Sequence, residues 1–137
     1  MAIEWSDSFN IGDEEINEQH RYLLRLVNDV LNAISRVELT GCVIHLFKYT
    51  REHFAYEEAL MRKVNFDEYD AHVQMHDRLV TQLGALGRNI SNDTLDKEVL
   101  ESFFMDWAVN HIPEADARLS RFLMAAECAE TAPVLQF

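Results

Sequence analysis

The sequence predicts an all-α protein: an up-down-up-down four-helix bundle with an N-terminal arm and a short C-terminal helix. Only four Gly and two Pro occur among the 137 residues, so few positions break a helix. Apolar residues recur at steps of three and four in successive segments, as on one face of a helix. Short connections between these segments favour antiparallel neighbours. The length suits one domain, expected over residues 1–137.

The composition indicates which classes of partner the protein does not bind and in which compartment it is expected. The net charge of −12 argues against nucleic acid or an anionic membrane, since both require a basic surface. The acidic N-terminus has no signal-peptide pattern, and no apolar run approaches the length of a membrane span. We therefore expect a cytoplasmic monomer. Cys42 and Cys128 are far apart, and each is expected to be a small buried residue rather than a metal ligand.

The arm is expected over about residues 1–11, with its aromatic side chains packed on the domain. Asp13 is then the expected N-cap of the first helix, because acidic residues follow it in the first turn. This helix is expected over about residues 13–37. Its apolar face carries Ile16, His20, Leu23, Leu24, Val27, Leu31 and Ile34.

Two further helices follow. The second is expected between a break at Thr40-Gly41 and about residue 64. Its buried face carries Val43, Leu46, Tyr49 or Thr50, His53, Glu57, Leu60 and Met61. The third is expected over about residues 68–86, capped by Asp67 and stopped by Gly87. Its face carries His72, His76, Leu79, Val80, Leu83 and Leu86.

The fourth helix is expected to begin near residue 93 or 94 and to complete the bundle, which spans about residues 13–112. Pro113 cannot continue the hydrogen-bond ladder, so we expect it to open a separate short helix ending near residue 127. This helix and a loosely ordered tail account for about residues 113–137. The face of the fourth helix carries Val99, Leu100, Phe103, Phe104, Trp107 and His111.

Several residues on these apolar faces are of the types that bind metals. His53 and Glu57 are four residues apart, which places both on one side of a helix. One histidine on an apolar face is more often a hydrogen-bonded core residue than a ligand. Many such groups together would cost about 1–3 kcal/mol each if left unsatisfied, and a metal satisfies them jointly. The candidate ligands are His20, His53, Glu57, His72, His76, His111 and Asp116.

The size and chemistry of this set favour two iron ions. Zinc takes about four ligands, often with Cys, so seven non-sulfur ligands are too many for one ion. Imidazole with carboxylate suits iron. Two irons offer roughly twelve positions, of which five histidines, two bridging carboxylates and one oxo or hydroxo bridge fill about eleven. About one position remains for a small molecule. His45 is turned by about 80° from His53 and is expected at the surface.

These residues, in this order, resemble the hemerythrin family, in particular its single-domain bacterial members. The resemblance covers most of the chain, from Trp5 and Phe9 in the arm to the last ligand motif. Each short motif is weak alone, and the combination is highly specific. The motifs are Ile16-Asn17-Glu18-Gln19-His20, His53-Phe54-Ala55-Tyr56-Glu57-Glu58, His72-Val73-Gln74-Met75-His76 and His111-Ile112-Pro113-Glu114-Ala115-Asp116.

The resemblance implies how the ligands are shared between the irons. One iron is expected to take three histidines and the other two, with Glu57 and Asp116 bridging both. O2 then binds at the open position of the iron held by His20 and His53. Such chemistry requires a dry pocket. Its expected walls are Leu23, Phe54, Trp107, Ala108 and Ile112.

Two residues depart from the family pattern. Asn17 stands where the family usually has Asp, which leaves the expected ligands unchanged. Ala108 stands where a bulky aliphatic residue is common, so we expect wider access to the open iron.

Three functions are consistent with these features. The first is reversible O2 binding for transport, storage or sensing, without turnover and with an unidentified protein acceptor. The second is a diiron oxidase, peroxidase or nitric-oxide-handling enzyme on the same scaffold. Ferritin-like enzymes use Glu-x-x-His pairs, and no Glu lies three residues before any histidine here, which disfavours that class. The third is a regulatory module, which would need a separate chain to receive its signal.

Overall fold

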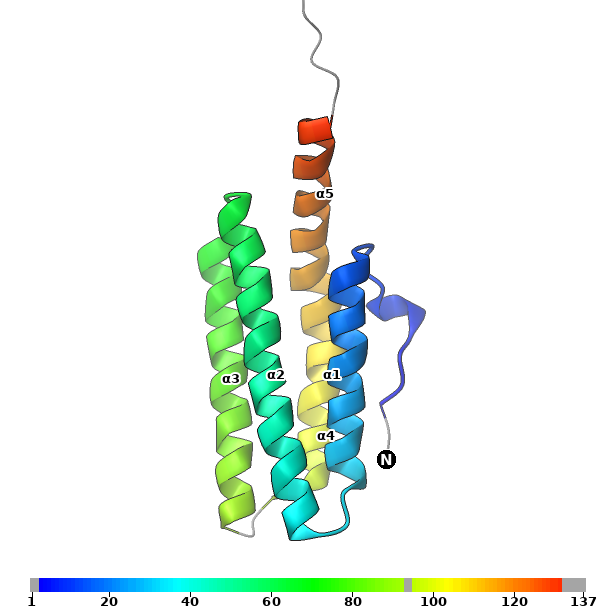
Figure 1. Ribbon diagram of the computed structural model, residues 1–137, viewed down its shortest axis with the longest axis vertical. Helices are drawn as coiled ribbons and strands as arrows, with labels where there is room; N and C mark the ends of the chain where they lie inside the picture. The colour runs from blue at the N-terminus through cyan, green and yellow to red at the C-terminus, as the bar shows by residue number, and fades with distance from the viewer. Residues whose placement is uncertain (1–2, 93–94, 132–137) are drawn as a thin grey trace, which may run out of the picture.

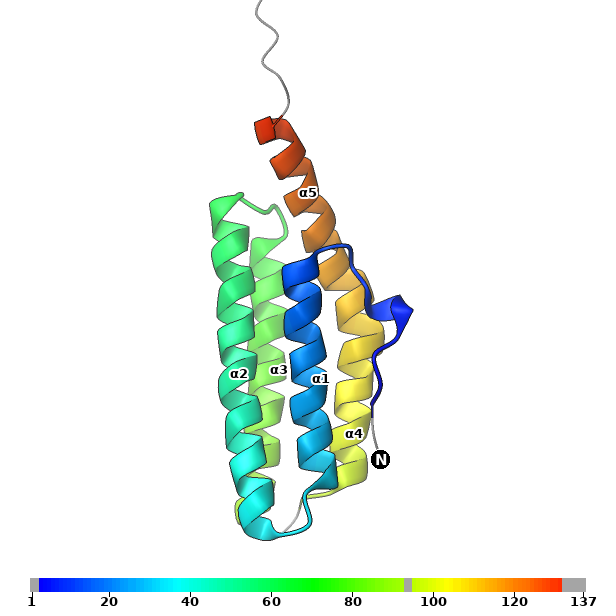
Figure 2. The same cartoon turned by 45° about the vertical axis from the view of Figure 1, so that its right-hand side comes forward.

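A computed structural model describes residues 3–92 and 95–131, and only the backbone of Ser91 and of residues 127–131. The described chain is all-α, and its four long helical columns run up, down, up and down (Figure 1). The predicted architecture is therefore confirmed. The columns begin with α1 (Glu14–Asn32), α2 (Arg36–Lys63), α3 (Tyr69–Ser91) and α4 (Lys97–Asp106). The last column continues through η2 (Trp107–Asp116) into α5 (Ala117–Thr131), whose end projects beyond the other helices (Figures 1 and 2).

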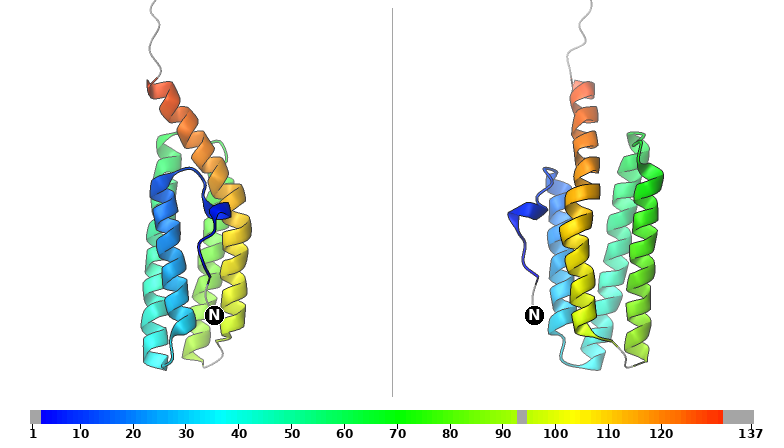
Figure 3. Two further views of the ribbon diagram at one scale, coloured as in Figure 1. Left: turned by 90° about the vertical axis from the view of Figure 1, so that its right-hand side faces the viewer. Right: turned by 180° about the vertical axis from the view of Figure 1, so that it is seen from behind.

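The N-terminal arm lies along the outside of α1 and α4 (Figure 3). It contains one short 3-10 turn, η1 (Asp7–Phe9), and buries Ile3, Phe9 and Ile11. Asn28 of α1 holds the start of the arm in place. The Asn28 side chain accepts from the N–H of Ile3 at 2.7 Å and donates to the Ile3 carbonyl at 2.8 Å. Gly12 ends the arm with φ at +87°, a backbone conformation that favours glycine.

Asp13 caps α1 as predicted, accepting from the N–H of Ile16 at 3.0 Å. The predicted end of this helix near residue 37 and the predicted break at Thr40-Gly41 are both wrong. Residues 33–35 connect α1 to α2, and the Ser35 hydroxyl accepts from the N–H of Glu38 at 3.1 Å. This cap starts α2 early enough to place Gly41 inside the helix. Ile34, expected on the buried face of the first helix, is instead 95% exposed in the connection.

The connection between α2 and α3 also differs from the prediction. Asn65, with φ at 53°, closes α2 by a Schellman motif in which the N–H of Phe66 donates to the Met61 carbonyl at 2.9 Å. Phe66 and Met61 are both buried and belong to one apolar cluster. Because the chain turns through Phe66, the N-cap is Glu68 rather than Asp67, and it makes no side-chain capping bond.

At the other end of α3, Gly87 does not stop the helix. Only Gly12 among the described glycines has a positive φ, so Gly87 lacks the left-handed conformation of a C-terminal stop. The helix continues to Ser91, and Ile90, which is 6% exposed, anchors its last turn in the core. The third helix is therefore about one turn longer than predicted.

The fourth column is continuous through Pro113, so the predicted helix end near residue 112 is wrong, and the predicted C-terminal helix, α5, begins at Ala117 without a break before it. Asp96 caps α4, which starts later than expected, and its carboxylate accepts from the N–H of Glu98 at 2.9 Å. A π-helical turn, η2, then carries Pro113 in its interior. Pro113 has no N–H to donate in either kind of helix, so the column passes through it with one backbone hydrogen bond fewer. Residues 132–137 of the predicted tail lie outside the described residues.

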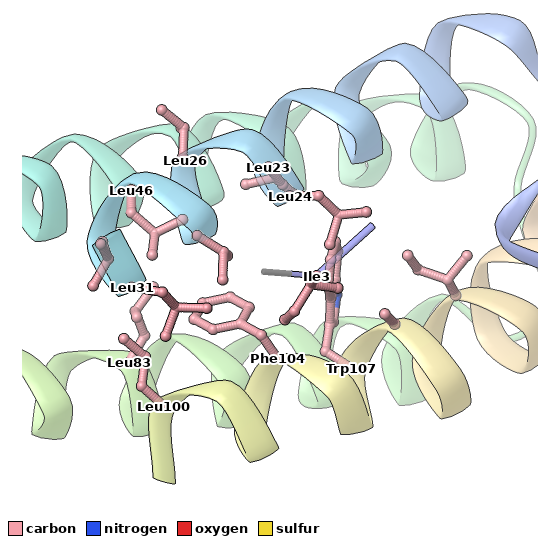
Figure 4. Packing of buried hydrophobic residues seen from close by; sticks show 14 of the residues in the cluster. Ile3, Leu23, Leu24, Leu26, Leu31, Leu46, Leu83, Leu100, Phe104 and Trp107 are labelled. Atoms are coloured by element: carbon pink, nitrogen blue, oxygen red, sulfur yellow. The ribbon is translucent and has the colours of Figure 1, made fainter. Parts of the chain in front are cut away.

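The bundle interior contains a continuous apolar core, in which side chains from the arm and the helical columns pack together (Figure 4). Leu46 of α2, Leu83 of α3 and Leu100 of α4 meet there, and all three are at most 2% exposed. Thr50 rather than Tyr49 is buried on α2, whereas Val99, expected on the buried face of the fourth helix, is 54% exposed. Cys42 is a half-buried free thiol, and the Cys128 side chain lies outside the described residues.

Candidate metal centre

All seven side chains expected to bind metal converge inside the bundle. Every helical column contributes at least one, and six of the seven are at most 2% exposed. Their donor atoms form two groups, in each of which all atoms lie within 4.8 Å of one another. Both groups contain Glu57 of α2 and Asp116 of η2. One group adds His72, His76 and His111, and the other adds His20 and His53.

The donor atoms face one another at short distances without satisfying one another. His20 Nε2 lies 3.0 Å from Asp116 Oδ2, and His53 Nε2 lies 3.0 Å from Glu57 Oε2. None of these four atoms makes a hydrogen bond within the described part of the chain. Leaving one buried polar group unsatisfied costs about 1–3 kcal/mol. Lone pairs that converge in this way fit a bound cation, so the residues present suit a metal.

The π-helical turn explains how η2 delivers two of these donors. His111 Nε2 lies 3.1 Å from Asp116 Oδ1, although the residues are five apart in sequence. In a regular α-helix such residues would point about 140° apart. The i→i+5 geometry of η2 brings both side chains to the bundle interior. Local π-helical segments are frequent at functional sites.

The metal-free centre is held together by charge. Burial and the neighbouring Asp116 oppose ionisation of Glu57, but His53 and His72 outweigh them and lower the pKa of Glu57. Burial likewise opposes ionisation of Asp116, and His111, His20 and His72 lower its pKa well below the ordinary value. Burial disfavours the His72 cation, yet the carboxylates of Asp116 and Glu57, whose nearest oxygens lie 3.1 and 3.2 Å from Nε2, raise the pKa of His72 to about 9.

The burial of His111 also opposes its charge, while Asp116 raises the pKa of this histidine overall. The raised pKa values of His72 and His111 favour their charged forms, which oppose the charge of the two carboxylates when no metal is bound. A metal requires neutral imidazole and takes over this balancing role.

Side chains that the sequence did not single out orient the candidate ligands. The Nδ1–H of His53 donates to Gln19 Oε1 at 2.7 Å, which directs Nε2 toward Glu57. Gln19 in turn donates to Glu15 Oε1 at 3.1 Å. Glu58 lies 3.9 Å from His76 Nδ1 at its nearest oxygen. The position of Gln19 directly before His20 is the only sequence signal that points to it.

Aromatic packing holds several histidine rings in place. Phe54 stacks on His76 with ring centroids 3.9 Å apart and an interplanar angle of 6°. Trp107 packs edge-on against His20 at 5.5 Å. His45, in contrast, is exposed as expected and belongs to neither donor group, with its Nε2 3.4 Å from the Tyr22 hydroxyl.

The residues expected to wall the ligand pocket are all buried. Leu23, Phe54 and Trp107 line an apolar cavity of about 10 Å³, together with Thr50 and other residues. A volume of this size is about the minimum that holds one water molecule. Ala108 and Ile112 are fully buried, but neither is among the residues that line this cavity.

Comparison with known proteins identifies the family. Residues 11–123 match the model of the hemerythrin HHE cation binding domain, which is most of the chain. The chain belongs to the hemerythrin family. It is 36% identical to a hemerythrin-like protein of Naegleria gruberi over 114 residues, which are 83% of this chain and 87% of that protein. It is 25% identical to a bacteriohemerythrin of Stenotrophomonas maltophilia over 111 residues, or 79% and 72% of the two chains.

A solved structure shows the same bundle. A crystal structure of a hemerythrin variant superposes with a TM-score of 0.81 at 28% sequence identity, covering 90% of this chain and 98% of that chain. Hemerythrins bind non-heme iron and are generally O2-binding proteins rather than enzymes. Among the described helices, none combines the length and apolar character needed to span a membrane.

Proposed function

We propose that this hemerythrin binds O2 reversibly at a pair of iron ions bridged by Glu57 and Asp116. The observation that carries the proposal is the sharing of these two buried carboxylates between two groups of donors. The group with three histidines offers five protein ligands, and the group with His20 and His53 offers four. At roughly six positions per iron, the four-ligand ion has more room for an added small molecule.

The surroundings of the four-ligand group favour a ligand as small as O2. Two irons held by these residues would supply a pair of electrons to O2 and would recover them on release. The chain contributes an apolar pocket that disfavours water, because the cavity of about 10 Å³ lined by Leu23, Phe54 and Trp107 offers water few hydrogen-bond partners. Trp107 and Phe54 also contact the rings of His20 and His53, at 5.5 and 5.6 Å between ring centroids. A bulkier organic substrate has no room in this cavity.

We also propose that the protein works as a cytoplasmic monomer. The net charge of −12 supports the monomeric state, because like charges keep copies of the chain apart in solution. Its role in delivery, storage or sensing then depends on an acceptor or partner chain that exchanges O2 or responds to it.

An anaerobic-to-aerobic absorption titration with iron quantified tests the function. We expect two irons per chain and visible absorption that appears with O2 and disappears on deoxygenation, without net release of peroxide. Steady production of peroxide, or consumption of peroxide or nitric oxide over many turnovers, would instead support the enzyme hypothesis. Fewer than two irons in the fully loaded protein would overturn the proposed centre.

A further inference from the structure

One surface cleft borders the candidate centre directly. It has a volume of about 370 Å³ and lies between α3, η2 and the first turn of α5. Of the seven candidate ligands, His111 is the one that lines it. His111 is 9% exposed, whereas the other six are 0–2% exposed. Its Nε2 nevertheless makes contact with Asp116 at 3.1 Å, so the ring spans the wall between the cleft and the centre.

The cleft carries groups that attract a hydrated cation. Asp106 and Glu114 on η2 and its N-terminal flank are exposed carboxylates, and Gln82 and Asn110 add amide oxygens. Carboxylate and amide oxygens attract a hydrated divalent cation such as ferrous iron, because they accept hydrogen bonds from its water shell. Two arginines also line the cleft, but Arg118 is paired with Glu68 at 3.4 Å. The carboxylates of Asp106 and Glu114 therefore outnumber the one arginine of the cleft that is not in this pair, Arg78.

The backbone under His111 also lacks one hydrogen bond that a regular helix would have. η2 has π-helical hydrogen bonding, and Pro113 within it has no N–H to donate. Segments with fewer backbone bonds open locally at lower free energy than regular helix. His53 and His76, in contrast, stand on regular α-helices and are held by Gln19 and by the stacked ring of Phe54.

We propose that this cleft is the route by which iron enters and leaves the centre. Asp106 and Glu114 concentrate the hydrated ion, and His111 is the first ligand of the centre that it meets. This inference rests on the proposed diiron site and adds the path by which that site is filled. It requires no chemical step other than exchange of water for protein ligands.

Blocking the cleft tests the route. Gln82 is an exposed residue of α3 that lines the cleft, and Gln82→Trp puts a bulky side chain there. The matched control is Gln74→Trp, at an exposed position of the same helix outside the cleft. Metal-free protein is mixed with anaerobic Fe²⁺, and the free ion is trapped at intervals with a ferrous chelator. We expect Gln82→Trp to slow both uptake and release by at least about tenfold. Because entry and exit share one path, the dissociation constant and the final two irons per chain stay unchanged.

A charge variant tests the same route without adding bulk. Glu114→Gln should slow uptake about threefold at low ionic strength and less at high salt, as expected for loss of an attracting charge. The control Asp29→Asn removes an exposed carboxylate on α1 and should load at the wild-type rate.

The two proposals fail in different ways. Wild-type uptake of two irons at a rate that Gln82→Trp leaves unchanged would overturn the route and leave the diiron site standing. Wild-type protein that never reaches two irons would overturn the site itself. A slowed Gln82→Trp protein with weakened affinity or altered circular dichroism would indicate damage to the fold, and the Glu114→Gln rate then decides the question.

Discussion

His111 and Asp116 are five residues apart, yet His111 Nε2 lies 3.1 Å from Asp116 Oδ1 because the helix between them is π-helical. Asp116 belongs to both groups of donors, so this turn connects the two halves of the candidate centre. The same turn places one edge of His111 in a surface cleft. One local departure from α-helical geometry thus completes the site and gives it contact with the outside.

Removing His76 should abolish most iron binding. His76 is 1% exposed and its Nε2 has no hydrogen bond among the described residues, so we expect it to be a ligand. His76→Ala removes one of three histidines from the five-donor group, and iron content should fall from two ions to at most one. Elemental analysis of the reconstituted protein measures this. The control is His45→Ala, an exposed histidine outside both groups, which should keep two irons and an unchanged spectrum. Full iron retention in His76→Ala would refute the ligand assignment.

Gln19→Leu should weaken metal binding without unfolding the protein. The change removes the acceptor for the Nδ1–H of His53 and frees the ring to rotate. Losing a partner that orients a ligand typically costs about 10–100-fold in metal affinity. Competition with a chelator of known affinity measures the loss.

Two controls distinguish orientation of His53 from packing. Gln19→Glu keeps an acceptor at the same place and should retain most of the affinity. Gln74→Leu makes the same change at an exposed glutamine on α3 and should have no effect. Equal affinities for Gln19→Leu and the wild type would show that the hydrogen bond has no part in metal binding.

The metal-free protein should lose stability as the pH rises from about 6.5 to 9. The pKa of His72 is raised from 6.5 to about 9, so its stabilising contribution is complete below pH 6.5 and is lost as the pH rises through about 9. Glu57 and Asp116 have lowered pKa values, so their contribution is present above their ordinary values of 4.5 and 3.8 and is lost in acid. The free energy of unfolding should therefore be greatest between about pH 5 and 6.5.

Urea denaturation of the metal-free protein across this range measures the effect. The metal-loaded protein is the comparison, and its stability should not decline between pH 6.5 and 9, because a metal requires neutral histidines. A metal-free protein whose stability is constant from pH 6.5 to 9 would contradict the charge network described for the centre.

Asn17→Asp should destabilise the arm and leave iron binding unchanged. Asn17 accepts from the N–H of Ile11 at 3.1 Å and donates to Asn10 Oδ1 at 2.8 Å. Aspartate cannot donate, and Asn10 cannot turn its amide without losing the bond from Gly12 N at 2.9 Å. We expect a loss of about 1 kcal/mol in the free energy of unfolding, by chemical denaturation. Reduced iron content in this variant would show instead that Asn17 affects the centre.

The sequence by itself determined the helical architecture and the set of candidate ligands. Apolar spacing identifies the buried face of a helix from local information, and polar residues on that face stand out because burying them is costly. His20, His53, Glu57, His72 and His76 were placed on inward faces in this way, and the structure buries all of them. The cap at Asp13 was equally local, because it depends on a side chain and the next few N–H groups.

Only the tertiary structure decided the helix ends, the orientation of the ligands and the surroundings of the centre. Ile90 extends α3 past Gly87 because its side chain is buried by distant residues, and the spacing of residues does not report such packing. Pro113 signals a helix break by local rules, but the column continues through it because Ile112 and Ala115 on either side are buried in the bundle. The hydrogen bond from His53 to Gln19 joins two helices, and the cleft at His111 is lined by residues of α3, η2 and α5. Both exist only once the helices have packed.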